Sequence, residues 1–253
     1  MNSHFRDRLK RGDLCIGTFL TLSCPEIAEL CAEAGFDWVF IDLEHTPLDV
    51  RDVQTMIPRL GNECGCLVRV SSREEGSIKK VLDTGVDGIV VPHIETRGET
   101  SDVVRQCLYP PDGNRGVGIS RAQKYGLGFG DYVEHANDRI LVIPQVESIT
   151  GVRNIEDIAR VPGISAVFVG PYDLSGSIGM LGRVESPEVQ QSINRVGCAC
   201  YGAGIPAGIF GVDVEAVEPY IEQGFTLIGL GMDTLFLGRS FCHALERLRG
   251  PSS

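Results

Sequence analysis

Eight short apolar runs alternate with segments of helical periodicity along almost the whole chain. Within the runs, polar and apolar residues show little alternation, which is typical of parallel strands that are covered on both faces. The chain has 253 residues, so each strand–helix unit has about 32 residues, as in a (β/α)8 barrel. We expect strands at Ile16–Leu22, Trp38–Leu43, Cys66–Val70, Gly88–Ile94, Ile140–Val146, Ala166–Val169, Pro206–Phe210 and Thr226–Leu230.

The helical segments between these runs end at glycines. Glu75–Thr84 is followed by Gly85, and Val214–Gln223 is followed by Gly224; glycine is common just beyond the end of a helix. A doubly wound sheet is the alternative, but no G-x-G-x-x-G motif follows the first run. No linker divides the chain. The sequence therefore predicts an α/β protein with one domain over residues 1–253, a (β/α)8 TIM barrel.

Composition argues against two classes of partner. The chain has 34 acidic and 23 basic residues, a formal net charge of −11, and such a field repels nucleic acids and anionic membranes. No run approaches the ~18 apolar residues of a transmembrane helix. The nine cysteines form no disulfide framework of the secreted type. We therefore expect a cytoplasmic protein with free thiols, no nucleic-acid partner and no membrane partner. The net charge does not exclude a small anionic substrate, because a few local cations or a metal ion can dominate one site.

Polar side chains gather at the carboxyl ends of four expected strands. In a parallel barrel these ends meet at one mouth, and the active sites of such barrels lie there. Residues that are far apart in the sequence are therefore expected to converge. They are Asp42, Glu44 and His45 at the second run, Arg69 at the third, Gln145 and Glu147 at the fifth, and Asp173 at the sixth.

Two of these carboxylates suit a divalent metal ion. Glu147 and Asp173 are about one strand–helix unit apart, so they are expected on adjacent strands. Two carboxylates that face one cavity need a cation or a shared proton. Ligation by oxygen atoms alone suits Mg²⁺ or Mn²⁺. The alternative is that both residues are solvated charges at the rim, or partners of local arginines.

The basic residues at the strand ends each have two interpretations. His45 is a candidate general base, because its ordinary pKa lies near neutral pH, or a structural histidine. Arg69 is a candidate for stabilising an oxyanion, or it forms a buried ion pair with Asp42 or Glu44. His93, at the end of the fourth run, is interpreted as structural.

Lysine-based covalent catalysis lacks its nucleophile. No lysine lies at the end of an expected strand, so Schiff-base chemistry is excluded. The chain also contains no G-x-S-x-G elbow and no P-loop. The lysines are Lys10, Lys79, Lys80 and Lys124.

Five ordered motifs carry a resemblance that extends from about Gly17 to Gly238. In them the chain resembles the HpcH/HpaI family of metal-dependent, class II pyruvate aldolases, and it is similar to 4-hydroxy-2-oxoheptanedioate and 2-dehydro-3-deoxygalactarate aldolases. The resemblance implies a barrel of the phosphoenolpyruvate/pyruvate-domain type. The motifs are AGFDWVFIDLEH (34–45), LVRV (67–70), YPPDGNRGVG (109–118), QVE (145–147) and GPYDLS (170–175).

The resemblance implies a metal site and a site for the substrate carboxylate. Glu147 and Asp173 would ligate Mg²⁺ or Mn²⁺, with Co²⁺ as a further possibility. Pyruvate, or the pyruvate half of a larger 2-oxo acid, would chelate this ion. Gln145, together with the backbone around Tyr172 and Asp173, would hold the carboxylate.

The resemblance also implies the catalytic groups. His45 would act as the base, directly or through a metal-bound water, and Asp83 would raise its basicity. Arg69 would stabilise the enolate oxygen. The implied reaction is cleavage or formation of a 4-hydroxy-2-oxo acid, with pyruvate and an aldehyde as the products of cleavage, through a metal-stabilised pyruvate enolate. The alternative is a citrate-synthase-like enzyme that condenses or decarboxylates oxaloacetate. A third reading is a barrel without catalytic activity.

Two further expectations follow from the resemblance. Family members are typically hexamers, dimers of trimers, that exchange a C-terminal helix, and the stretch Asp233–Leu248 could take that part or form an eighth helix within its own barrel. Tyr172 replaces a small residue that is common in the family, and the segment Ile119–Gly126 departs from the pattern of sugar-acid aldolases. The first departure bears on the shape of the carboxylate pocket, and the second on the choice of aldehyde.

Overall fold

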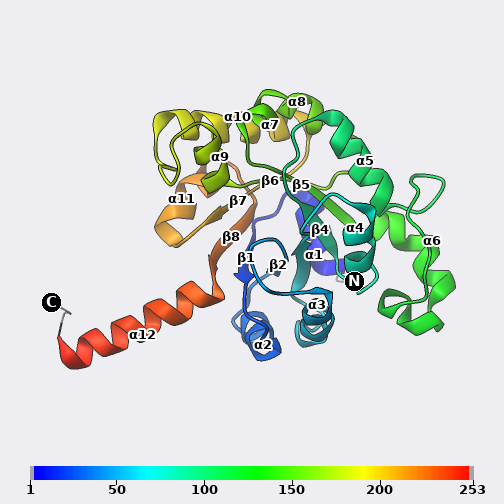
Figure 1. Cartoon of the computed structure of the whole chain (residues 1–253), viewed down its shortest axis with the longest axis horizontal. Helices are drawn as coiled ribbons and strands as arrows, with labels where there is room; N and C mark the ends of the chain where they lie inside the picture. The colour runs from blue at the N-terminus through cyan, green and yellow to red at the C-terminus, as the bar shows by residue number, and fades with distance from the viewer. Residues whose placement is uncertain (1–2, 251–253) are drawn as a thin grey trace.

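The computed structural model describes residues 3–250, and its centre is a closed barrel of eight parallel strands (Figure 1). Each strand pairs with the next one in the chain, and the last pairs with the first. The predicted (β/α)8 TIM barrel is confirmed. The strands are β1 (Cys15–Leu20), β2 (Trp38–Asp42), β3 (Gly65–Arg69), β4 (Gly88–Val91), β5 (Leu141–Val146), β6 (Val167–Val169), β7 (Ala207–Gly211) and β8 (Leu227–Met232).

Helices follow the strands and surround the barrel (Figure 1). Most of them pack on the outside of the strands, but the first and the last are placed differently. The helices are α1 (Ser3–Arg11), α2 (Pro25–Glu33), α3 (Val50–Met56), η1 (Ile57–Arg59), α4 (Glu75–Leu82), α5 (Arg97–Cys107), η2 (Arg121–Gly126), α6 (Phe129–Arg139), α7 (Ile149–Arg153), α8 (Ile155–Ile158), α9 (Pro171–Ser177), α10 (Pro187–Ala203), α11 (Val214–Glu222) and α12 (Asp233–Arg249).

The fourth strand is shorter than the expected run Gly88–Ile94, because β4 ends at Val91. Pro92 lacks an N–H to donate to a strand ladder, and His93 has a φ of 56°, which lies in the left-handed region rather than the extended one. The chain therefore turns sharply at His93, directly after the strand. The periodicity of apolar residues could not reveal this turn, because apolar residues continue on both sides of His93, up to Ile94.

The apolar core has two layers, one inside the barrel and one between the strands and the helices. Phe19, Phe40 and Phe168 are buried inside the barrel. Helix α1 covers the amino ends of the strands: Phe5 is buried there, and its ring stacks on that of Trp38, with the two ring centroids 6.2 Å apart. Helix α1 therefore closes the barrel interior at its amino end.

Helix α12 does not pack along the barrel. Its first turns lie close to the barrel, where α12 contacts β8 and β1 and Arg239 donates a hydrogen bond to the carbonyl oxygen of Val212 over 3.1 Å. From there the helix projects away from the body of the molecule (Figure 1). The expectation of an eighth helix within the chain's own barrel is therefore wrong for this chain. The side chains of Phe241 and Leu248 are 63% and 86% exposed, so a large apolar surface of α12 is uncovered.

Within residues 3–250, no helix is both long and apolar enough to cross a bilayer. All nine cysteines are free thiols, which confirms that expectation. Their burial differs: Cys66 and Cys107 lie in the core, whereas Cys198 and Cys242 are exposed.

Candidate active site at the carboxyl ends of the strands

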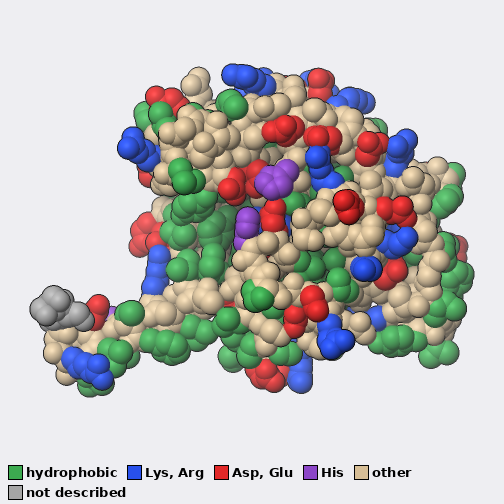
Figure 2. All heavy atoms as spheres, in the orientation of Figure 1, with side chains coloured by type: hydrophobic (Ala, Val, Ile, Leu, Met, Phe, Trp, Pro, Cys, Tyr) green, Lys and Arg blue, Asp and Glu red, His purple; other side chains and the backbone are tan. Residues whose placement is uncertain are grey.

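A cavity of about 400 Å³ opens at the carboxyl ends of the strands. Figure 2 shows histidine side chains (purple) beside acidic ones (red) near the centre of this face. Most of the residues predicted from the strand ends line the cavity. They are Asp42, His45, Arg69, Gln145, Tyr172 and Asp173.

Asp42 and Arg69 form a buried, two-point ion pair. They lie opposite each other in the register of β2 and β3. Arg69 donates from Nε and Nη2 to the two carboxylate oxygens of Asp42, over 2.8 and 2.7 Å. Burial alone would raise the pKa of Asp42, but the hydrogen bonds and charge of Arg69 outweigh it and hold that pKa below its ordinary value. Arg69 is thus in the buried ion pair considered above, while its Nη1 has no hydrogen bond to the described residues.

Glu44 joins three basic side chains. Its Oε2 lies 3.2 Å from Arg69 Nε and 3.7 Å from His45 Nε2, and its Oε1 lies 3.0 Å from His93 Nε2. The side chain of His45 is 60% exposed, whereas that of Glu44 is 10% exposed. Glu44 therefore anchors the basic groups at the mouth, and His45 keeps one side open to a ligand.

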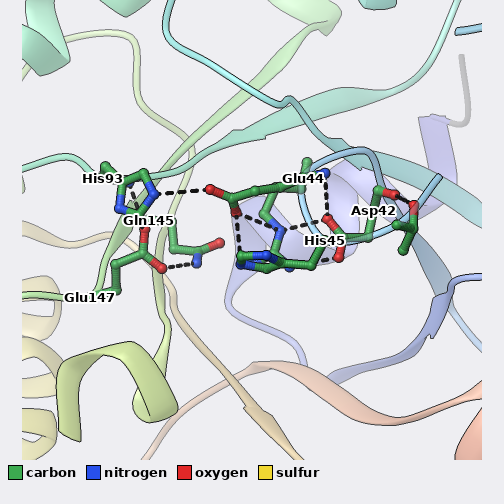
Figure 3. A network of polar contacts seen from close by, with 8 residues as sticks. Asp42, Glu44, His45, His93, Gln145 and Glu147 are labelled. Carbon is green, nitrogen blue, oxygen red and sulfur yellow. Dashed lines mark hydrogen bonds and ion pairs between the residues drawn. The ribbon is translucent and has the colours of Figure 1, made fainter. Parts of the chain in front are cut away.

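Glu147 follows β5 and is held by neighbours on two sides (Figure 3). Its Oε1 accepts one hydrogen bond, from the backbone N–H of His93 over 2.7 Å, and the same oxygen lies 3.0 Å from His93 Nδ1. Its Oε2 accepts from Gln145 Nε2. Gln145 and Glu147 are two residues apart, so both side chains point to the same side of the strand path. Burial raises the pKa of the Glu147 carboxyl above its ordinary value, although these hydrogen bonds oppose the shift.

Gly170 allows Glu147 to approach the start of α9. A Cβ at this position would lie 2.8 Å from Glu147 Oε2 and 3.0 Å from Gln145 Nε2, closer than such atoms can pack. Asp173 is in the first turn of α9, three residues further on. Its side chain is exposed and has no hydrogen bond or ion pair to the described residues. Glu147 therefore contacts the residue that precedes α9, and Asp173 lines the cavity from the first turn of that helix.

These residues fit a divalent ion that keeps water or substrate among its ligands. The Oε1 atom of Gln145 is buried and has no hydrogen-bond partner within residues 3–250. Among the described residues, neither Asp173 nor the buried Glu147 forms an ion pair with an arginine or a lysine. No group of three or more histidine, cysteine or acidic residues in this part of the chain could hold a metal on its own. Mg²⁺ is commonly held in proteins by one or two carboxylates, with the remaining positions filled by water or substrate.

An aromatic layer lies beneath the polar cluster. The rings of Phe19 and Phe40 stack with centroids 3.9 Å apart, and Arg69 Cζ lies 5.6 Å from the centroid of Phe40. Tyr172 forms part of the cavity wall, and its ring centroid lies 6.3 Å from that of Phe210. Phe19, Phe168 and Phe210 line the same cavity, so its inner wall is apolar.

Asp83 is not part of this cluster. It follows α4 and comes five residues before β4 begins, so it lies at the amino end of the barrel. There it accepts a hydrogen bond from Arg115 Nη2 over 2.8 Å, and Arg115 in turn lies over the ring of Tyr109. Within one chain Asp83 therefore does not lie beside His45, and its effect on the basicity of His45 stays a prediction.

His93 is the site residue that the sequence interpretation missed. The sequence favours a structural role for His93, because a lone histidine after an apolar run gives no indication of its partners. The structure places it between Glu44 and Glu147. Its position at a strand end was the available signal, since the other residues of the cluster share it.

Comparisons with known proteins agree with this geometry. The sequence model of the HpcH/HpaI aldolase/citrate lyase family matches residues 15–239. The chain belongs to this family. Its predicted assignment to the carbon–carbon lyases is confirmed at the level of the family.

Individual relatives cover nearly the whole chain. A hydroxypyruvate/pyruvate aldolase of Paraburkholderia phytofirmans is 39% identical over 252 residues, which cover 96% of each chain. The crystal structure of a family member from Burkholderia cenocepacia superposes with a TM-score of 0.94 at 38% identity, covering 98% of this chain and 100% of that one. The structure of a citrate synthase, SbnG, gives a TM-score of 0.86 at 28% identity, covering 96% of each chain.

Proposed function

We propose that the protein is a divalent-metal-dependent aldolase that cleaves or forms a 4-hydroxy-2-oxo acid, with pyruvate and an aldehyde as the products of cleavage. The observation that carries this proposal is the buried carboxylate of Glu147 beside Gln145 and Gly170, at the mouth where Asp173 and the ion-paired Arg69 line one cavity. The relative named hydroxypyruvate/pyruvate aldolase supports the substrate class.

Glu147 and Asp173 would hold the metal, Mg²⁺ or Mn²⁺, with Co²⁺ as a third candidate. When bound there, a divalent ion supplies Lewis-acid stabilisation of negative charge on a keto oxygen. The unpartnered Oε1 of Gln145 lies against the same space. Its amide and the backbone at Tyr172 are the groups that we propose for orienting the substrate carboxylate.

Arg69 would stabilise the oxygen of the enolate. Two of its nitrogens are fixed by Asp42, so the guanidinium is held rigidly in the cavity wall. A donor that is positioned in advance loses little energy to reorganisation as charge develops. The free Nη1 is the atom that we assign to this contact.

His45 would remove the hydroxyl proton of the 4-hydroxy acid in the cleavage direction. It lines the cavity and is exposed to it. Among the described residues its ring has one charged neighbour, Glu44, at 3.7 Å. Loss of that proton and rupture of the C3–C4 bond leave the aldehyde and the enolate of pyruvate, which then takes up a proton.

The deciding test combines metal binding with product analysis. Glu147→Gln and Asp173→Asn keep the size of each side chain but remove its charge, so both variants are expected to lose Mn²⁺ binding and more than about 10³-fold of the activity, since metal stabilisation of charge is worth several kcal/mol. Glu75→Gln, on the outer helix α4, is the matched control. Mn²⁺ affinity would be measured by calorimetry, and pyruvate release from hydroxy-oxo acids of several lengths by a coupled assay.

Oxaloacetate serves as the competing substrate in the same assay. The similarity to a citrate synthase structure makes a condensing or decarboxylating enzyme the second candidate. Loss of CO₂ from oxaloacetate, without aldehyde release from any hydroxy-oxo acid, would favour that candidate. Retained Mn²⁺ affinity in both carboxylate variants would contradict the metal site itself.

We further propose that the chain forms a cytoplasmic homohexamer, a dimer of trimers. The support is the uncovered apolar surface of α12, where Phe241 and Leu245 are exposed. Figure 2 shows hydrophobic side chains (green) along this projecting helix. Large exposed apolar patches usually mark interaction sites.

A further inference from the structure

We propose that His93 is a positioning residue that aims one oxygen of Glu147 at the metal ion. The inference rests on the proposed role of Glu147 as a metal ligand. It concerns which of the two carboxylate oxygens of Glu147 is available to bind the metal ion, and which contacts leave that oxygen available. Figure 3 shows His93 between Glu147 on one side and Glu44 on the other.

The two oxygens of Glu147 have different surroundings. Oε1 faces two nitrogens of His93, the backbone N at 2.7 Å and the ring Nδ1 at 3.0 Å. Oε2 receives one hydrogen bond, from Gln145. A carboxylate oxygen has about two lone-pair sites, so Oε1 is fully engaged and Oε2 keeps one site free. Oε2 is also the oxygen that lies against Gly170, which directly precedes helix α9 with Asp173 in its first turn.

The backbone of His93 makes this double contact possible. With a φ of 56°, the residue lies in the left-handed region, which histidine and asparagine enter more readily than most residues. In an extended strand, successive residues point to opposite faces. A regular continuation of β4 through His93 would therefore not place both the backbone N–H and the ring of His93 beside Glu147 Oε1. The turn instead brings the backbone N–H and the ring of one residue to the same oxygen.

His93 also ties Glu147 to the arginine side of the site. Its Nε2 lies 3.0 Å from Glu44 Oε1, and Glu44 Oε2 lies 3.2 Å from Arg69 Nε. A continuous series of contacts therefore runs from Asp42 through Arg69, Glu44 and His93 to Glu147. Groups that hold a metal ligand from behind typically contribute 10–100-fold to metal affinity or activity.

The side chain can be replaced without opening a cavity in the core. It is 63% exposed, so its removal costs little packing. The backbone N–H to Glu147 remains in any non-proline variant that keeps the left-handed conformation. The ring and backbone contributions can therefore be separated by the choice of substitution.

Two variants test the ring contact. His93→Gly keeps the backbone conformation and removes the ring. His93→Asn also tolerates this conformation, and its amide nitrogen can occupy the position of Nδ1 but cannot reach Glu44. We expect His93→Gly to bind Mn²⁺ about 10–100-fold more weakly than the wild type, and His93→Asn to recover most of that loss.

The readout is the dissociation constant of Mn²⁺ for the full-length protein without substrate, with the thermal midpoint of the metal-free form as a control for folding. Glu147→Gln is measured in parallel. If the wild type binds Mn²⁺ and Glu147→Gln does not, but His93→Gly binds as tightly as the wild type, the role of His93 is refuted. Equal weakening in His93→Gly and His93→Asn would refute it as well, because the donor at Nδ1 would then not matter. Full Mn²⁺ affinity in Glu147→Gln would instead refute the proposed metal site.

Discussion

At the scale of single residues, Arg69 shows how one side chain can be both structural and available for chemistry. Its Nε and Nη2 bind Asp42, and its Nη1 forms no hydrogen bond within the part of the chain that the structure describes. Arginine can divide its donors in this way because the guanidinium has five N–H groups in a fixed plane, whereas the ammonium of lysine is a single point charge. The ion pair and the proposed contact to the enolate oxygen are therefore compatible.

Arg69→Lys is expected to lower turnover by about 10²–10³-fold, the usual effect of losing one donor to an oxyanion, while Mn²⁺ affinity changes little. Lysine keeps the positive charge beside Asp42 but cannot also present a second fixed donor. Turnover and calorimetric Mn²⁺ affinity would be measured together. Arg105→Lys, at an exposed arginine on α5, is the control. Undiminished turnover in Arg69→Lys would remove Arg69 from the reaction.

At the scale of elements, the close contact between β1 and β2 depends on a glycine. Gly17 lies opposite Trp38 in the strand register. A Cβ on Gly17 would lie 2.4 Å from the Trp38 ring and 2.5 Å from its carbonyl oxygen. Trp38 is fully buried and packs against Phe5 of α1, so the ring has no room to move away.

Gly17→Ala is expected to reduce the free energy of unfolding by about 1–3 kcal/mol or more, as overpacking does in a dense core. Gly76→Ala provides the contrast, because no atom lies within 4 Å of its added Cβ. It lies in α4, where alanine is favoured over glycine by about 0.5–1 kcal/mol. Unfolding of both variants by denaturant would measure the two changes in the free energy of unfolding. A Gly17→Ala protein as stable as the wild type would show that β1 and β2 can separate more easily than the register implies.

At the scale of the whole molecule, α12 sets this chain apart from a self-contained barrel. Leu237, Phe241, Leu245 and Leu248 recur at spacings of three and four residues, so they share one face of the helix. All four are exposed. An apolar stripe on a helix that projects from its own barrel needs a partner, and the proposed hexamer supplies one.

Phe241→Glu is expected to dissociate the assembly into smaller species, because a charge buried in an apolar contact without a partner costs several kcal/mol. His243→Glu introduces the same acidic side chain on another face of α12 and serves as the control. Sedimentation velocity would report the size of each variant. A wild-type protein that sediments as a monomer, or a Phe241→Glu variant with unchanged size, would argue against the proposal.

The barrel, and the meeting of polar side chains at its carboxyl end, could be predicted from the sequence alone. The lengths of the apolar runs and the glycines beyond the helices are local properties. They depend on the backbone conformation that each segment favours by its own sequence. Asp42, Arg69, Gln145 and Asp173 meet at one mouth because all carboxyl ends of parallel strands lie on the same side of a barrel. No knowledge of individual contacts was needed for this step.

Only the tertiary structure decided which partner each charged side chain takes. Arg69 pairs with Asp42 because the register of β2 and β3 sets them opposite each other. His93 reaches Glu147 through a left-handed turn that apolar periodicity does not encode. Asp83 lies at the other end of the barrel from His45, since α4 runs back antiparallel to the strands. Such contacts depend on distances between segments far apart in the chain, and these distances exist only once the barrel has closed.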